Sequence, residues 1–146
     1  HSHIKVVEKA LWTHGNGLSF YQEGADAGHL ITPSIHKSAT SAITVPTITL
    51  EEIVADQAVD LLKIDIEGAE CDVLIDREAT LKHVARLFVE YHSFHRQAQR
   101  LDELLLTLRE SGFRFQIHQE LISQSPFISQ PDDHGMDHRL NIFAWK

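Results

Sequence analysis

Two short stretches of the sequence each end in a pair of ionisable residues that could do chemistry. Asp65 and Glu67 follow the apolar run VDLLKI, and Glu90 and His92 close the run LFVEYH. A carboxylate near the end of a buried strand is costly unless it is paired, hydrogen-bonded or used. If the two runs are neighbouring strands, the four groups converge. Such clusters shift pKa values and are candidate functional sites.

His92 is the candidate general base, because the ordinary pKa of histidine lies near about 6.5 and a carboxylate can orient its ring. We predict catalytic roles for Asp65, Glu67, Glu90 and His92 and assign no metal ligand. A divalent cation in this oxygen-rich cluster is chemically reasonable, and a purely structural ion network would perturb pKa values as well. Glu70 is interpreted more simply, as an acid that favours a helix N-terminus.

The elements that must position these residues alternate between strands and helices. We predict strands near residues 5–11, 18–22, 60–66, 86–91, 113–118 and 140–145, and helices within 50–56, 69–84 and 95–111. Alternation of this kind indicates an α/β fold with a mostly parallel sheet and helices packed on its faces. The strands at 60–66 and 86–91 should then be adjacent and parallel. Ligands of such sheets sit beyond the carboxyl ends of the strands.

Local signals refine these boundaries. Thr49 and Glu52 have the spacing of a capping box at the start of the first helix. The last helix carries leucines on one face and Gly112 at its expected C′ position. The glycines at 15 and 17 indicate a hairpin or a tight connection between the first two strands, and residues 24–44 and 121–138 indicate loops.

Composition limits the classes of function. With 146 residues the chain is long enough for one domain with a core, and its formal charge is −8. An acidic chain is repelled by phosphate backbones and anionic membranes, so we expect neither nucleic acid nor membrane as a partner. A single cysteine, Cys71, excludes an internal disulfide. No apolar run reaches a membrane span and no signal peptide is evident, so a cytoplasmic location is predicted.

The segment KIDIEGAE, residues 63–70, closely resembles the signature of FkbM-like S-adenosylmethionine-dependent methyltransferases. Three further segments are similar to that family in the same order: VVEKALW (6–12), VPTITLEEI (45–53) and LFVEYH (87–92). The resemblance therefore covers nearly the whole chain, with KIDIEGAE as its most specific part.

This resemblance implies the class I (Rossmann-like) methyltransferase fold, a mostly parallel sheet with an antiparallel last strand. It also implies methyl transfer from S-adenosylmethionine to a small-molecule acceptor, usually a hydroxyl oxygen of a sugar or natural product. Asp65 falls where the family faces methyl donor and acceptor, and Ala10 and Leu11 fall near the adenine, so these three are the expected cofactor-binding residues. Glu67, Glu90 and His92 match positions on the acceptor side.

One departure from the family pattern is large. The first strand with its glycine-rich turn, and the second strand, would precede residue 1, since no glycine-rich strand–turn–helix occurs in residues 1–146. We therefore expect the chain to be the C-terminal part of one catalytic domain, with exposed sheet edges that favour a homo-oligomer. Two alternatives stay open: a non-catalytic α/β binding module, or a metal-dependent hydrolase that uses the same acids.

Overall fold

The computed structural model describes residues 3–23, 27–29, 42–95, 97–120, 123–129 and 135–146. The chain divides into two compact units, residues 1–53 and 54–146. Each unit is described by itself. Within the described residues no helix has both the length and the apolar character needed to cross a bilayer.

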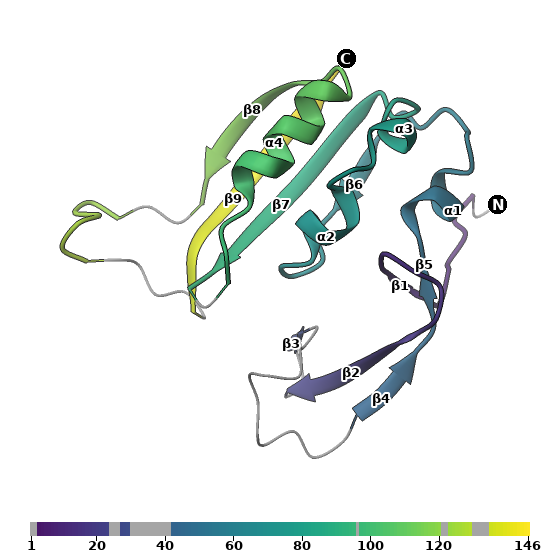
Figure 1. Ribbon diagram of the computed structural model, residues 1–146, viewed down its shortest axis with the longest axis horizontal. Coiled ribbons are helices and arrows are strands. Elements are labelled where there is room, and N and C mark those ends of the chain that lie inside the picture. The colour runs from purple at the N-terminus through teal and green to yellow at the C-terminus, as the bar shows by residue number, and fades with distance from the viewer. Residues whose placement is uncertain (1–2, 24–26, 30–41, 96, 121–122, 130–134) are drawn as a thin grey trace. The chain divides into compact units, whose positions relative to one another are not determined.

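The N-terminal unit is built mainly from short strands (Figure 1). Its elements are β1 (Ala10–Leu11), β2 (Leu18–Glu23), β3 (Ala27–His29), β4 (Ala42–Val45), β5 (Thr47–Ile48) and the start of α1 (Leu50–Val54). β1 pairs with β5 in parallel, and β2 pairs with β3 and β4 in antiparallel fashion. The mixed α/β character is as predicted, although β3 lies inside the stretch 24–44 that was predicted as a loop and β4 begins inside it. The rest of that stretch lies outside the described residues.

The strand predicted at 5–11 is limited to Ala10–Leu11. Of the two alternatives predicted for the glycines at 15 and 17, the hairpin onto that strand is wrong and the tight connection is confirmed. Instead, the buried Thr47 holds this turn from β5. Its Oγ1 accepts a hydrogen bond from Gly17 N at 2.9 Å and donates one to the carbonyl of His14 at 2.6 Å. The turn is thus fixed by a residue about thirty positions away.

The capping box at α1 is confirmed. Thr49 N donates to Glu52 Oε2 at 2.9 Å, and Glu52 N donates to Thr49 Oγ1 at 3.3 Å. The backbone hydrogen bond from Thr49 is the main cause that lowers the pKa of Glu52. These two bonds satisfy backbone donors that a helix N-terminus leaves without intrahelical partners.

The C-terminal unit contains a four-stranded sheet in the order β6-β7-β9-β8. The strands are β6 (Leu62–Ile64), β7 (Arg86–Phe94), β8 (Arg114–Gln119) and β9 (Met136–Trp145), and the helices are α2 (Glu70–Leu74), α3 (Glu78–Leu81) and α4 (Leu101–Glu110). β6 and β7 are adjacent and parallel, with Ile64 opposite Val89, as predicted. The last strand, β9, runs antiparallel to both β7 and β8, and it begins inside the stretch predicted as a loop.

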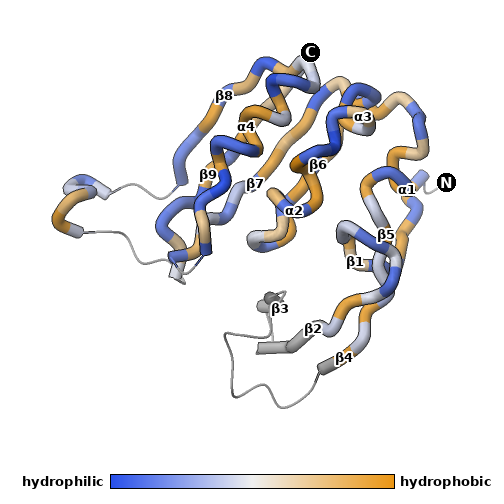
Figure 2. The backbone as a smooth tube through the Cα atoms, viewed as in Figure 1, coloured by the Kyte–Doolittle hydropathy of each residue, from blue (hydrophilic) through white to orange (hydrophobic). Residues whose placement is uncertain are grey.

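The core of this unit lies between the sheet and its helices. α2, α3 and α4 lie on one face of the sheet (Figure 1), and hydrophobic positions concentrate along β7 and α2 (Figure 2). Alternate residues of β7, namely Leu87, Val89 and Tyr91, are buried. This spacing of two is expected for a strand with one face against the core.

The C-terminal end of α4 agrees with the prediction from sequence, whereas its N-terminal end does not. It begins at Leu101 rather than at 95, because residues 95–100 are mostly polar and offer no apolar face to bury. Leu104 and Leu108 are fully buried. At the C-terminus Gly112 has φ +87°, and Phe113 N bonds to Leu108 O at 3.0 Å. These two features form a Schellman motif, in agreement with the C′ position predicted for Gly112.

Candidate active site

The segment after β6 is a tight turn that leads into α2. Glu67 and Gly68 both have left-handed backbone conformations, with φ +56° and +100°. A left-handed non-glycine residue stores strain and is common at functional sites. A Cβ on Gly68 would lie 2.6 Å from the ring of Phe94, so this turn passes directly against β7. The turn thereby brings the Glu67 side chain toward the end of β7.

Glu70 holds this turn from the first position of α2. Its Oε1 accepts hydrogen bonds from Ile66 N at 3.1 Å and from Gly68 N at 3.0 Å. The same oxygen lies 3.0 Å from Nδ1 of His92. Glu70 is 1% exposed, so its carboxylate is almost completely removed from water. A buried acid needs several donors to offset its desolvation, and here three groups converge on one oxygen.

His92 lies at the centre of the cluster, on β7 and beyond the last residue that β6 pairs with. Its side chain is 2% exposed, and its Nε2 faces Glu90 Oε1 at 3.6 Å and Glu67 Oε2 at 3.8 Å. Burial acts to lower the pKa of His92, but the hydrogen bond to Glu70 and the charges of Glu70, Glu67 and Glu90 outweigh it. The pKa is therefore raised above its ordinary value.

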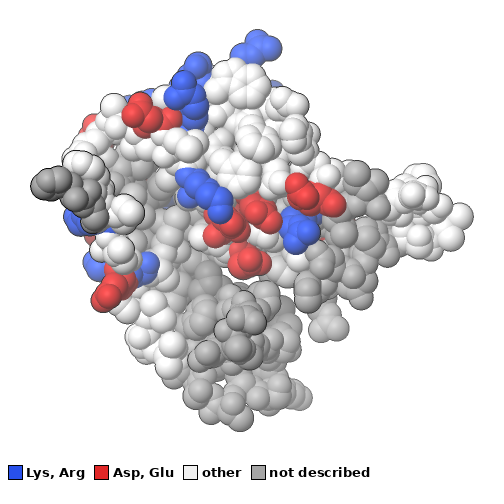
Figure 3. Space-filling view, turned by 180° about the vertical axis from the view of Figure 1, so that it is seen from behind, with Lys and Arg blue, Asp and Glu red and all other residues white. Residues whose placement is uncertain are grey.

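Asp65 is a partly exposed member of the cluster. Its Oδ2 accepts a 2.7 Å hydrogen bond from Lys63 Nζ, and its side chain is 29% exposed. This hydrogen bond is the main cause that raises the pKa of Lys63. Lys63 also lies 5.8 Å from the ring centre of Phe88 on β7. Acidic side chains gather near the middle of the face shown in Figure 3, with basic side chains beside them.

One group of described residues could hold a metal ion. Asp65, Glu90 and His92 each offer a ligand atom, and these atoms lie within 4.8 Å of one another. Oxygen and imidazole ligands suit several divalent cations. Because carboxylates also gather where no cation binds, this geometry leaves the metal alternative open without favouring it.

The structure brings together all four residues predicted to be catalytic, Asp65, Glu67, Glu90 and His92, within one unit. Ala10 and Leu11 form β1 in the N-terminal unit, so their expected place beside the adenine stays a prediction. Sequence reasoning missed Glu70, which it treated as a helix-terminal acid. Its neighbours Ala69, Cys71, Val73 and Leu74 are apolar and buried, and an acid within such a run was the available signal.

Comparison with known proteins shows the family to which the chain belongs. The family model described as "Methyltransferase FkbM domain" matches residues 3–115 of the chain. The chain therefore belongs to the FkbM methyltransferase family, whose activity is methyl transfer. It has no significant match among curated proteins and none among solved structures. The family match gives no support to the non-catalytic module or to the metal-dependent hydrolase.

Proposed function

We propose that this protein transfers a methyl group from S-adenosylmethionine to a hydroxyl oxygen of a sugar or natural product, with His92 as the general base. The observation that carries the proposal is the position of His92. It is buried, and it lies at the carboxyl-terminal side of two parallel strands. Its Nε2 faces the carboxylate of Glu67 in the signature turn and that of Glu90 on β7. Ligands of α/β sheets bind at that edge.

The residues present fit the proposed methyl donor. S-adenosylmethionine carries a sulfonium and an ammonium group, and it supplies an electrophilic methyl group when bound. Asp65, Glu67 and Glu90 have side chains that are 29%, 56% and 25% exposed, so their carboxylates can meet a cationic ligand from the solvent side. Asp65 is the proposed contact to donor and acceptor together, and Ala10 and Leu11 are proposed to lie beside the adenine.

His92 would act on the acceptor rather than on the donor. When the acceptor oxygen bonds to the methyl carbon, the methyl–sulfur bond of the donor would break, and its electron pair would stay on sulfur in the thioether that leaves. The hydroxyl proton would pass to the neutral imidazole of His92. The ring then becomes a cation, which the carboxylates of Glu67 and Glu90, at 3.8 and 3.6 Å, stabilise.

We also propose that both units belong to one catalytic domain with a class I methyltransferase sheet. The family match spans both units, which supports a common domain. The parallel pair of β6 and β7, followed by an antiparallel last strand, supports this class of sheet.

The test is a screen of the full-length protein with methyl-labelled S-adenosylmethionine against a panel of monosaccharide glycosides and polyhydroxylated aromatic compounds. We expect label in an O-methyl product, and no label when the reacting hydroxyl is replaced by hydrogen. A product that carries the methyl group on nitrogen or carbon would overturn the hydroxyl acceptor. Absence of any labelled product across the panel would count against the proposed acceptor class.

A further inference from the structure

We infer that Glu70 is a positioning residue for His92: it fixes the ring through Nδ1 and leaves Nε2 as the atom that receives the acceptor's proton. The contact between the two side chains is independent of the reaction, whereas the role of Nε2 rests on the function proposed above. Nothing in the family match assigns a role to either residue.

The hydrogen-bond network selects one tautomer of His92. Glu70 Oε1 already accepts hydrogen bonds from Ile66 N and Gly68 N, so this oxygen acts as an acceptor. The ring nitrogen 3.0 Å from it must then donate, which places a proton on Nδ1. In the neutral ring the lone pair therefore lies on Nε2, the nitrogen that a general base would use.

Burial shields this arrangement from water. The side chains of Glu70 and His92 are 1% and 2% exposed, so water does not compete for their contact. A charge-assisted hydrogen bond in such surroundings is stronger than one at the surface. Because the same oxygen of Glu70 also fixes the Ile66–Gly68 turn, it sets both the ring and the segment that carries Glu67.

The groups around the ring explain how it can take up a proton although it is buried. Glu70 faces Nδ1 from α2, while Glu67 and Glu90 face Nε2 from the turn and from β7. On β9 the register neighbour of His92 is Arg139. Burial disfavours the charged ring, but the three carboxylates reverse that effect and raise the pKa of His92.

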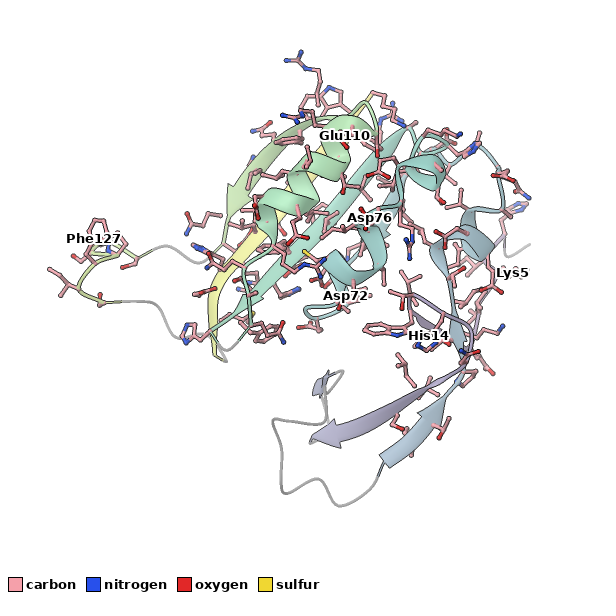
Figure 4. All side chains as sticks on the ribbon, in the orientation of Figure 1. Lys5, His14, Asp72, Asp76, Glu110 and Phe127 are labelled. Atoms are coloured by element: carbon pink, nitrogen blue, oxygen red, sulfur yellow. The ribbon has the colours of Figure 1, made fainter. Side chains whose placement is uncertain are left out.

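The matched test compares Glu70→Gln with Asp72→Asn. The glutamine keeps the shape of Glu70 and removes its charge. Asp72 lies on the same helix (Figure 4), is 45% exposed and pairs with Arg100. Nitrogen NMR of the histidine rings, with His92 assigned from its missing signal in His92→Gln, reports both tautomer and pKa. We expect Glu70→Gln to lower the pKa of His92 by about one pH unit, a tenfold change in proton affinity, and Asp72→Asn to leave it unchanged.

Two results would overturn the inference. In the wild-type protein, a neutral His92 with its proton on Nε2 would contradict it without any variant, and this holds even if Glu70→Gln fails to fold. A folded Glu70→Gln protein with unchanged tautomer and pKa would show that Glu70 supports only the turn. If the NMR result is as expected but no hydroxyl compound is methylated, the positioning role stands and the proposed function fails.

Discussion

Gly68 and Phe94 are in such close approach that a Cβ on the glycine would lie 2.6 Å from Cε2 of the ring. Gly68 also has φ +100°, a backbone conformation that residues other than glycine rarely adopt. Two separate restraints, one steric and one conformational, therefore require glycine in the turn that follows β6. This turn carries Glu67, so its geometry bears directly on the acidic cluster.

Substitution Gly68→Ala should accordingly destabilise the protein more than a glycine replacement elsewhere. Gly112 is the matched control, because it has φ +87° but no atom within 4 Å of an added Cβ. We expect Gly112→Ala to cost about 1 kcal/mol from backbone strain. Gly68→Ala should cost roughly 1–3 kcal/mol more from overpacking against the ring. Urea unfolding measures the stability of both variants. Equal losses of stability would show that the Phe94 ring moves aside without cost.

Cys71 should be chemically inert in the folded protein. Burial raises the pKa of its thiol to about 12, and the residue is only 8% exposed. The thiolate is the reactive form, so a disulfide reagent at pH 8 should label Cys71 only when the protein unfolds. In urea the thiol is exposed, so labelling should reach one group per chain, because Cys71 is the only cysteine. Rapid labelling without denaturant would contradict the buried position.

The stability of the protein should depend on the protonation of His92. Because the pKa of His92 is raised in the folded state, its charged form stabilises the fold. This contribution is fully present below the ordinary pKa of about 6.5 and is lost as pH rises through the higher folded value. The difference in unfolding free energy between wild type and His92→Gln should therefore decrease from pH 6 upward. A difference that grows with pH would contradict the sign of the shift.

Asp65→Asn should weaken both cofactor binding and turnover, because the proposed place of Asp65 faces methyl donor and acceptor together. The variant removes one charge while it keeps the shape of the side chain. Losing a charged hydrogen bond costs about 1.5–3 kcal/mol, so we expect a fall of about tenfold or more in each quantity. Asp60→Asn, an exposed residue before the same strand, is the control. An effect on turnover alone would place Asp65 on the acceptor side only.

Sequence patterns predicted best where local signals and tertiary contacts agreed. The runs that became β6 and β7 are apolar and paired as expected, and the leucines of α4 with Gly112 gave a helix with the expected end. The N-terminal strand was overextended because its β-branched residues favour a strand, while β1 has only a short partner in β5. A turn at Gly17 was predicted, but the hairpin alternative failed because β1 pairs with β5 and Thr47 fixes the turn from a distance.

For the acidic cluster too, the sequence predicted what depends on local spacing and missed what depends on long-range packing. The positions of Asp65, Glu67, Glu90 and His92 at strand ends were enough to predict that they meet. The role of Glu70 was missed because a helix-terminal acid is usually solvated. Only the approach of β7 to α2 reveals that the Glu70 carboxylate is buried against His92. Burial of a single polar side chain depends on such long-range packing, which local spacing does not contain.

The most direct test of the proposed function is turnover by His92→Gln, measured with methyl-labelled S-adenosylmethionine and the hydroxyl acceptor that the screen identifies. Calorimetry of cofactor binding and unfolding curves accompany it, and His83→Gln, a partly exposed histidine beside Asp56, is the control. General-base contributions are of order 10²–10⁴-fold. We therefore predict a fall of that size in kcat for folded His92→Gln, with the Kd for the cofactor changed by less than about threefold and with His83→Gln unaffected. A folded His92→Gln enzyme that keeps near-normal turnover would show that the cluster is structural and that His92 is not the base.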